Sequence, residues 1–124
     1  MKNYYLPAQR KKPEISLNYK KGYLSISGFA LVSNPFDFYR HTMDWVKEYV
    51  SQPQDRTVCD IRLCYFNTST AKCLMDMFRV LESIANRKEV VLNWYYEETD
   101  EDMEEAGVDF KQILHFDVNL IPYK

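Results

Sequence analysis

The sequence predicts a single two-layer α/β domain spanning residues 1–124, with helices mainly on one face of a four- to five-stranded mixed sheet. The first observation is the order of apolar patterns along the chain, which is β-β-α-β-α-β-α-β. Strands separated by helices in this way pair largely in parallel. The second observation is the central strand, residues 58–65, of which only one side is largely apolar. That strand alternates Cys59, Ile61, Leu63 and Tyr65 on one side with Val58, Asp60, Arg62 and Cys64 on the other.

A β-hairpin is predicted near the N-terminus. Apolar and polar residues alternate over 15–19 and again over 23–27, which is typical of strands with one buried face. Lys20-Lys21-Gly22 lies between them and supplies the turn.

The first helix is predicted to follow a connector over residues 28–33. Asn34 is a favourable N-cap and Pro35 is favourable at the first helical position. The helix is expected to extend to about Val50, because the residue before Pro53 disfavours helical geometry.

The second half of the chain alternates helices and strands. A helix is expected from about Ser69 to Asn86, followed by a strand over 90–96 that is rich in β-branched and aromatic residues. A third helix is expected to begin near Thr99 or Asp100. The last strand is marked by Phe116, Val118 and Leu120.

Composition and charge argue against several classes of function. No stretch approaches a membrane span and the first residues lack the apolar core of a signal peptide, so we expect a cytoplasmic protein without a membrane partner. Residues 1–24 carry a net charge of +5 and the remainder −7, which is a weak basis for nucleic-acid binding. Three cysteines without a CxxC pair are expected to be small buried or half-buried residues: Cys59, Cys64 and Cys73.

No metal, cofactor or catalytic motif is found. The run from Glu97 to Glu105 holds seven acids in nine residues, but it lacks the spacing and glycine of a calcium loop. Acids favour the first turn of a helix, so we interpret the run as a solvated helix start, with contact to a basic partner as the alternative. His41 and His115 have no accompanying ligand cluster, and no glycine-rich phosphate loop or GxSxG elbow is present.

The run from Phe66 to Thr70 places three hydroxyls where the central strand gives way to the second helix. Such residues ordinarily act as N-caps, and the pattern alone favours that role. The first N–H groups of a helix also lack internal partners and carry a partial positive charge, so a phosphoryl group on Thr68 or Ser69 would find donors directed at it. The junction is therefore suited to a phosphorylation switch.

The residues around this junction resemble a known family. The segment from Asp60 to Phe78, DIRLCYFNTSTAKCLMDMF, is similar to the signature of SiaC-type regulatory phosphoproteins, roughly D-x-R-L-x-Y-x-N-T-S-S-x-K-x-x-M-D-x-F. The resemblance continues through most of the chain and implies a STAS-like fold, as in anti-sigma-factor antagonists. It includes Tyr5-Leu6-Pro7, residues 22–28, Phe38-Tyr39, Trp45 and residues 92–96. Two departures are Thr70, where the family has serine, and the connector from Ala30 to Asn34, where a proline-glutamate pair is expected.

The resemblance implies a protein without catalytic activity that is phosphorylated on Thr68. The modifying enzyme would be a serine/threonine kinase with a histidine-kinase-like ATPase fold, and a PP2C-type phosphatase would reset the switch. The unmodified form would bind and activate a GGDEF diguanylate cyclase, which links the protein to c-di-GMP signalling and biofilm regulation.

Roles for neighbouring side chains follow from their positions. We expect Asn67 to shape the turn and contact the phosphoryl group, while Ser69 and Thr70 satisfy free N–H groups of the helix. Lys72, one turn after Thr68, is a candidate countercharge, although a solvated lysine is the ordinary alternative. Three further charged residues are either paired charges on the open face of the sheet or part of a kinase or cyclase footprint: Asp60, Arg62 and Asp76.

Two other functions remain open at the level of sequence. The same switch in an anti-sigma-factor antagonist would sequester a kinase-like anti-sigma factor and free a sigma factor. A small-molecule-binding or hydrolytic domain would instead use a polar pocket at the carboxyl end of the central strand, beside Thr68.

Overall fold

The computed structural model describes residues 1–124 and contains one six-stranded mixed sheet with the strand order β1-β2-β3-β4-β5-β6. The first three strands pair antiparallel and the last four, beginning with β3, pair in parallel. The strands are β1 (Tyr4–Leu6), β2 (Glu14–Asn18), β3 (Tyr23–Ala30), β4 (Arg56–Phe66), β5 (Glu89–Glu97) and β6 (Asp117–Tyr123). The helices are α1 (Pro35–Phe38), α2 (Arg40–Tyr49), α3 (Thr68–Glu82) and α4 (Glu101–Ile113).

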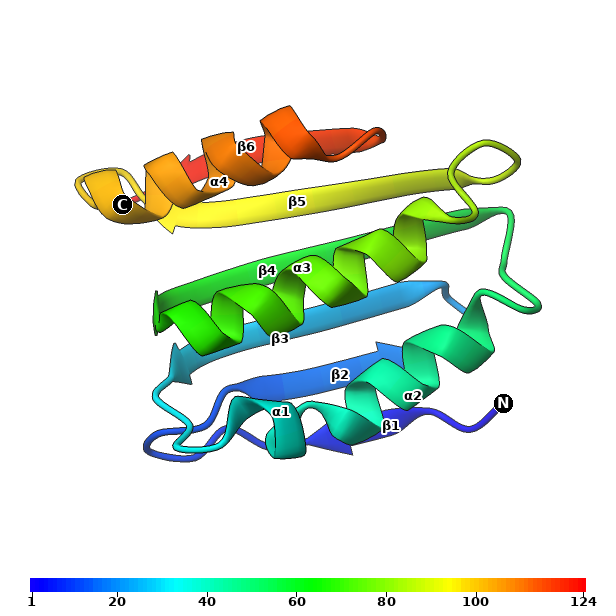
Figure 1. Cartoon of the computed structure of the whole chain (residues 1–124), viewed down its shortest axis with the longest axis horizontal. Coiled ribbons are helices and arrows are strands. Elements are labelled where there is room, and N and C mark those ends of the chain that lie inside the picture. The colour runs from blue at the N-terminus through cyan, green and yellow to red at the C-terminus, as the bar shows by residue number, and fades with distance from the viewer.

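All four helices lie on the same face of the sheet (Figure 1). The two-layer α/β architecture is therefore confirmed, whereas the expected count of four to five strands is wrong. The additional strand is β1, in which Tyr4–Leu6 pair with Ile15–Leu17. Three residues are too few for an alternating pattern to be visible in the sequence, and the strand exists because β2 offers it a free edge.

The first helix is interrupted at Tyr39, which separates α1 from α2. Asn34 caps α1 through its side-chain oxygen, 3.3 Å from the Asp37 nitrogen, as the sequence predicted. Tyr39 then leaves helical geometry, with φ −88° and ψ 4°, and its N–H bonds to carbonyls of α1. The break turns the Tyr39 side chain into the protein, where it is 5% exposed.

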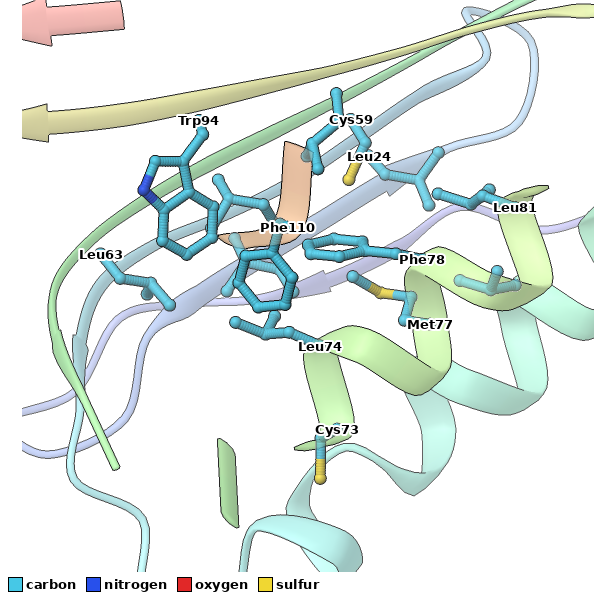
Figure 2. Close-up of a cluster of buried hydrophobic side chains, with 14 of the residues drawn as sticks. Leu24, Cys59, Leu63, Cys73, Leu74, Met77, Phe78, Leu81, Trp94 and Phe110 are labelled. Atoms are coloured by element: carbon cyan, nitrogen blue, oxygen red, sulfur yellow. The ribbon is translucent and has the colours of Figure 1, made fainter. Parts of the chain in front are cut away.

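The core lies between the sheet and the helices, and aromatic residues at its centre join three elements (Figure 2). The ring of Phe110 in α4 meets Phe78 of α3 edge-on and is tilted against Trp94 of β5, with centroids 5.1 Å apart in both pairs. The Trp94 indole also donates a hydrogen bond to the Met103 carbonyl at 2.9 Å. Gly107 permits this approach, because a Cβ there would collide with the indole ring.

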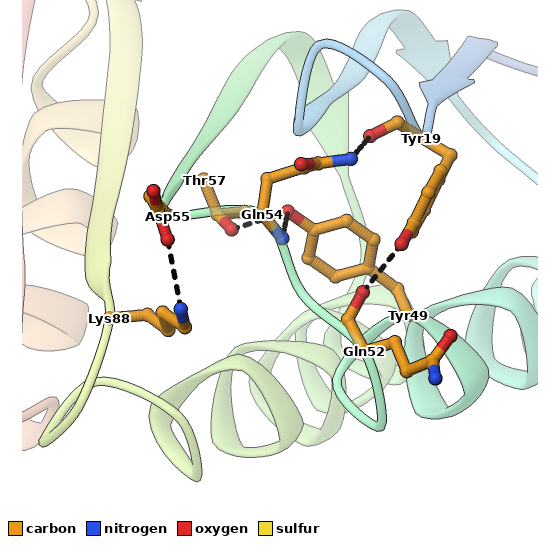
Figure 3. Close-up of polar contacts among 7 residues, drawn as sticks. All are labelled: Tyr19, Tyr49, Gln52, Gln54, Asp55, Thr57 and Lys88. Atoms are coloured by element: carbon orange, nitrogen blue, oxygen red, sulfur yellow. Dashed lines mark hydrogen bonds and ion pairs between the residues drawn. The ribbon is translucent and has the colours of Figure 1, made fainter.

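At the amino end of the parallel strands, polar contacts link the hairpin turn to the connection between α2 and β4 (Figure 3). The Tyr49 hydroxyl lies 2.7 Å from Thr57 Oγ1, and both groups are buried. Tyr19 donates to the Gln52 carbonyl at 2.9 Å and accepts from the Gln54 side chain at 3.1 Å through its own carbonyl. These hydrogen bonds satisfy the polar groups at the end of the core where the parallel strands begin.

The register of β4 against β3 shifts by one residue near its end. Gly28 pairs with Leu63 but Phe29 pairs with Tyr65, so Cys64 is an additional residue in β4. A bulge of this kind reverses the side-chain alternation beyond it. Tyr65, predicted to face the core, is 44% exposed and stacks on Phe29. Cys64 was expected to be buried or half-buried and is exposed.

The sheet face opposite the helices remains open, as the alternation in β4 predicted. It carries a transverse row of polar side chains centred on Asp60, which accepts hydrogen bonds from Tyr23 at 2.6 Å and Asn93 at 2.9 Å. Asn119 extends the row by donating to Asn93 at 3.0 Å. None of the helices combines the length and the apolar character needed to cross a bilayer.

Candidate phosphoacceptor site

The junction between β4 and α3 lies at the carboxyl edge of the parallel strands (Figure 1). Phe66 ends the strand and packs edge-on against Trp94, with ring centroids 5.8 Å apart. Asn67 follows in extended geometry, φ −97° and ψ 176°, and α3 begins at Thr68. The chain thus turns sharply from a strand anchored in the core into the first turn of a helix.

Asn67 is the N-cap of α3. Its side-chain oxygen accepts a hydrogen bond from the Thr70 nitrogen at 2.8 Å, and its carbonyl accepts from the Ala71 nitrogen at 2.9 Å. Asn67 therefore fixes the turn through its side chain, and its contact with a phosphoryl group stays a prediction. The capping oxygen comes from this asparagine, although Ser69 and Thr70 were expected to supply it.

The three hydroxyl residues of the junction have different environments. Thr68 and Ser69 are exposed, whereas Thr70 is 0% exposed and its hydroxyl has no hydrogen-bond partner. Thr68 is the first residue of α3, so its own N–H and that of Ser69 have no acceptor within the helix. An enzyme can reach Thr68 and Ser69, and a phosphoryl group on either would lie next to unpaired donors.

Lys72 is not directed at Thr68 in this structure. Its ammonium lies 3.2 and 3.3 Å from the two carboxylate oxygens of Asp76, one turn further along α3. The pair is solvent-exposed and follows the i,i+4 spacing of helix surfaces, which contributes about 0.3–0.5 kcal/mol. For Lys72 the expected alternative was a solvated lysine, and here its ammonium is exposed but paired. Asp76 is a paired surface charge as expected, but it lies on α3 and not on the open face of the sheet.

Asp60 and Arg62 lie on the open sheet face, whereas Asp76 lies in the helix layer. The three charged residues singled out in the sequence therefore do not form one cluster. Asp60 is half-buried within the polar row of the open face, where it accepts the hydrogen bond from Tyr23. Burial of Tyr23 is the larger cause, and this hydrogen bond the second, that raise the pKa of Tyr23 to about 12.

Arg62 is held between two tyrosines on the open face. Its guanidinium carbon lies 4.2 Å from the ring centroid of Tyr123 and 5.8 Å from that of Tyr95. These aromatic partners were missed in the sequence, as were Tyr23, Asn93 and Asn119. Their side chains lie on the same open face of the sheet as those of Asp60 and Arg62. This can be recognised only once the pairing of the strands with β4 is known.

A hollow of about 260 Å³ lies at the carboxyl end of β4, facing the start of α4. Asp100 is the N-cap of α4, accepting from the Met103 nitrogen at 3.1 Å, so the acidic run is a helix start as predicted. The lining combines two carboxylates with mostly apolar side chains: Cys64, Tyr65, Phe66, Asp100, Asp102 and Met103. No group of three or more His, Cys, Asp or Glu side chains is placed to hold a metal ion.

Comparison with known proteins identifies relatives along nearly the whole chain. The family model for SiaC family regulatory phosphoproteins matches residues 6–123. An uncharacterized protein of Pseudomonas aeruginosa strain UCBPP-PA14 is 28% identical over 117 residues, covering 94% of this chain and 93% of its own.

Solved structures of SiaC from Pseudomonas aeruginosa share the fold. SiaC itself superposes with a TM-score of 0.89 at 26% identity, covering 99% of this chain and 100% of SiaC. A second structure holds the diguanylate cyclase SiaD in complex with its activator SiaC, and there the TM-score is 0.90 at 26% identity, covering 97% of this chain and 99% of the matched chain. From its fold, its junction and the match over residues 6–123, this chain belongs to the SiaC family of regulatory phosphoproteins.

Proposed function

We propose that this protein is a non-enzymatic phosphorylation switch whose acceptor is Thr68 and whose unmodified form activates a GGDEF diguanylate cyclase. One observation carries the proposal: at the position that matches the acceptor in the family signature, the chain has an exposed threonine at the first residue of α3. Ser69 is also exposed, and the signature is what favours Thr68 over it.

A phosphate on Thr68 would act through charge. It adds about −1.5 to −2 elementary charges and three acceptor oxygens. The α3 N-terminus would stabilise that charge in the free protein by roughly 0.3–1 kcal/mol. If a partner buries the same point without a countercharge, desolvation costs several kcal/mol, and a difference of about 3 kcal/mol weakens binding more than a hundredfold.

The partners in this scheme are a serine/threonine kinase with a histidine-kinase-like ATPase fold, a PP2C-type phosphatase and the cyclase, and the switch protein itself is expected in the cytoplasm. The complex of SiaD with its activator SiaC supports the cyclase as the effector, because this chain covers 99% of the matched chain. The kinase and phosphatase are inferred from the family resemblance.

Two surfaces are candidates for partner contact. One surrounds Thr68 and runs along α3 through the Lys72–Asp76 pair, which lies four and eight residues beyond the acceptor on the same helix stripe. The other is the open sheet face around Arg62, where arginine and tyrosine side chains gather. Arginine and tyrosine are enriched at the energetic centres of protein interfaces.

Phosphorylation by the cognate kinase and ATP, followed by mass spectrometry of the phosphopeptide, tests the acceptor. Wild type and Ser69→Ala should be modified, and Thr68→Ala should remain unmodified. Ser69→Ala is a matched control because it removes an adjacent exposed hydroxyl from the same helix turn. Undiminished labelling of Thr68→Ala would reject the assignment.

A second assay tests the output. Purified cyclase should produce more c-di-GMP with the unmodified protein, and the phosphorylated protein should lose that effect. Thr68→Ala should activate in the presence of kinase and ATP, since it cannot be switched off. Cyclase activity that is equal with and without the protein would reject the activator role and leave the phosphorylation result standing.

A further inference from the structure

Three buried hydroxyls meet where α1, α2 and α3 come together. The oxygen atoms of Tyr39, Thr42 and Thr70 are the only buried side-chain nitrogen or oxygen atoms that lack a hydrogen-bond partner. Their side chains belong to residues that are 5%, 1% and 0% exposed. Buried polar groups in folded proteins are nearly always satisfied by protein or by ordered water, so three exceptions at one place need an explanation.

The three residues come from elements that the fold brings together. Tyr39 is the residue at which α1 breaks from α2, Thr42 lies in the first turn of α2, and Thr70 lies in the first turn of α3. Burial raises the pKa of Tyr39, the Cys73 thiol raises it further, and the Thr70 hydroxyl opposes the change. Tyr39 and Cys73 also line the same small cavity, whereas the hydroxyls of Tyr39 and Thr70 form no hydrogen bond with each other.

A small cavity lies at this place. Its volume is about 10 Å³, which is close to the space that a single water molecule requires. Three of its lining residues carry a group able to form hydrogen bonds, namely Tyr39, Thr42 and Cys73. The remaining walls are apolar: Ile26, Met43, Leu74 and Met77.

We propose that this cavity is a binding site for one ordered water molecule, held by the hydroxyls of Tyr39 and Thr42 with the Cys73 thiol as a weaker third partner. Buried waters typically make about three hydrogen bonds to otherwise unsatisfied groups, which is the number available here. A hydroxyl both donates and accepts, so one water can pair with the hydroxyls of Tyr39 and Thr42 together. The water would thus give a partner to the two unpaired hydroxyls that line the cavity, those of Tyr39 and Thr42.

The size and chemistry of the cavity select water over other occupants. A volume of about 10 Å³ admits no larger ligand, and its polar lining is neutral, so an ion would be buried without a countercharge. A water here joins Thr42 of α2 to Cys73 of α3, five residues after Thr68. It would therefore hold the acceptor helix in place on its inner side, opposite the exposed Thr68.

A high-resolution crystal structure of the wild-type protein tests the site directly. The expected result is an ordered water within hydrogen-bond distance of Thr42 Oγ1 and Tyr39 Oη. In solution, a nuclear Overhauser effect between a long-lived water and the Thr42 methyl group should accompany it. Direct bonding between the hydroxyls of Tyr39 and Thr42, with no density between them, would overturn the proposal.

Valine substitutions at two buried threonines test whether the water depends on the Thr42 hydroxyl. Thr42→Val should lose the water, and its own methyl groups should show no Overhauser effect to water. Thr42→Ser keeps the hydroxyl but has no methyl group, so its crystal structure should still show the ordered water. Thr57→Val is the matched control, because the buried Thr57 hydroxyl bonds directly to Tyr49, and this variant should retain the water. A water signal that persists at full strength in Thr42→Val contradicts the assignment, and the wild-type measurement decides the question if that variant does not fold.

Discussion

Replacing Asn67 with alanine should destabilise the protein through the first turn of α3. The asparagine oxygen is the acceptor of a 2.8 Å hydrogen bond from the Thr70 nitrogen, a donor that the helix cannot satisfy internally. Alanine removes the acceptor and leaves this partly buried N–H without a protein partner. Thr68 and Ser69, which lie between the two residues, would lose the contact that fixes their turn.

The size of the effect follows from the cap and its burial. Loss of an asparagine N-cap costs about 1 kcal/mol, with a range of roughly 0.5–2. Because the Thr70 side chain is 0% exposed, water reaches this turn poorly and the upper half of the range is expected. A loss of about 1–2 kcal/mol in a chain of this length lowers the melting temperature by roughly 3–8 °C.

Thermal and urea unfolding followed by circular dichroism measure this loss. Asn34→Ala is the matched control: its bond to the Asp37 nitrogen is longer, 3.3 Å, and it caps a helix of only four residues in an exposed position. That variant should lose less than about 0.5 kcal/mol, and Asn67→Asp should remain close to wild type because aspartate caps equally well. Equal stability of wild type and Asn67→Ala would show that the cap does not stabilise α3.

Three further predictions concern the core and the open face. Gly107→Ala should lower the melting temperature, because the new methyl group collides with the Trp94 ring. Overpacking of this kind costs about 1–3 kcal/mol of stability, which exceeds the roughly 1 kcal/mol that alanine gains in helix propensity. A higher melting temperature would contradict this. The pKa of Tyr23 is raised from 10.0 to about 12, so the protonated tyrosine stabilises the fold fully below pH 10, and this stabilisation is lost as the pH rises towards 12. Tyr23→Phe should therefore lose less stability than wild type between pH 10 and 12. The same pH dependence of unfolding in both proteins would refute this reasoning. Arg62→Ala should weaken binding of the cyclase while lowering stability by only about 0.5–1 kcal/mol, and unchanged affinity would exclude the Arg62 surface from the interface.

The sequence was sufficient where one local rule determines the structure. Alternation alone located the hairpin and helical spacing identified α3. The N-cap preference placed Asn34 at the start of α1 and narrowed the start of α4 to Thr99 or Asp100, of which Asp100 is the cap. The one-sided apolar pattern of the central strand correctly indicated that helices cover a single face. In each of these cases the signal and the structure involve the same short segment.

The errors in the fold arose where the structure depends on a distant segment. β1 is held by its pairing with β2, and the Lys2 carbonyl accepts a bond from Trp45 at 2.8 Å, a contact 43 residues apart in sequence. The slip that exposes Tyr65 depends on the register between β3 and β4. The break at Tyr39 lies within an apolar pattern that continues without interruption on both sides, so periodicity could not reveal it.

Exposure distinguishes the residues of the junction in a way that residue type cannot. Thr68 and Thr70 are chemically identical and two positions apart, yet one faces solvent and the other points into the core. The helix turn imposes this difference, because residues two apart lie on different faces of α3. A phosphate could therefore be added at Thr68 without disturbing the packing beneath Thr70. The energies favour the same conclusion. The helix N-terminus stabilises the phosphate charge by at most about 1 kcal/mol, which is too little to rearrange the fold. Burial of the charge against a partner destabilises the complex by several times as much. In the proposed switch, phosphorylation would control the interface and leave the domain itself unchanged.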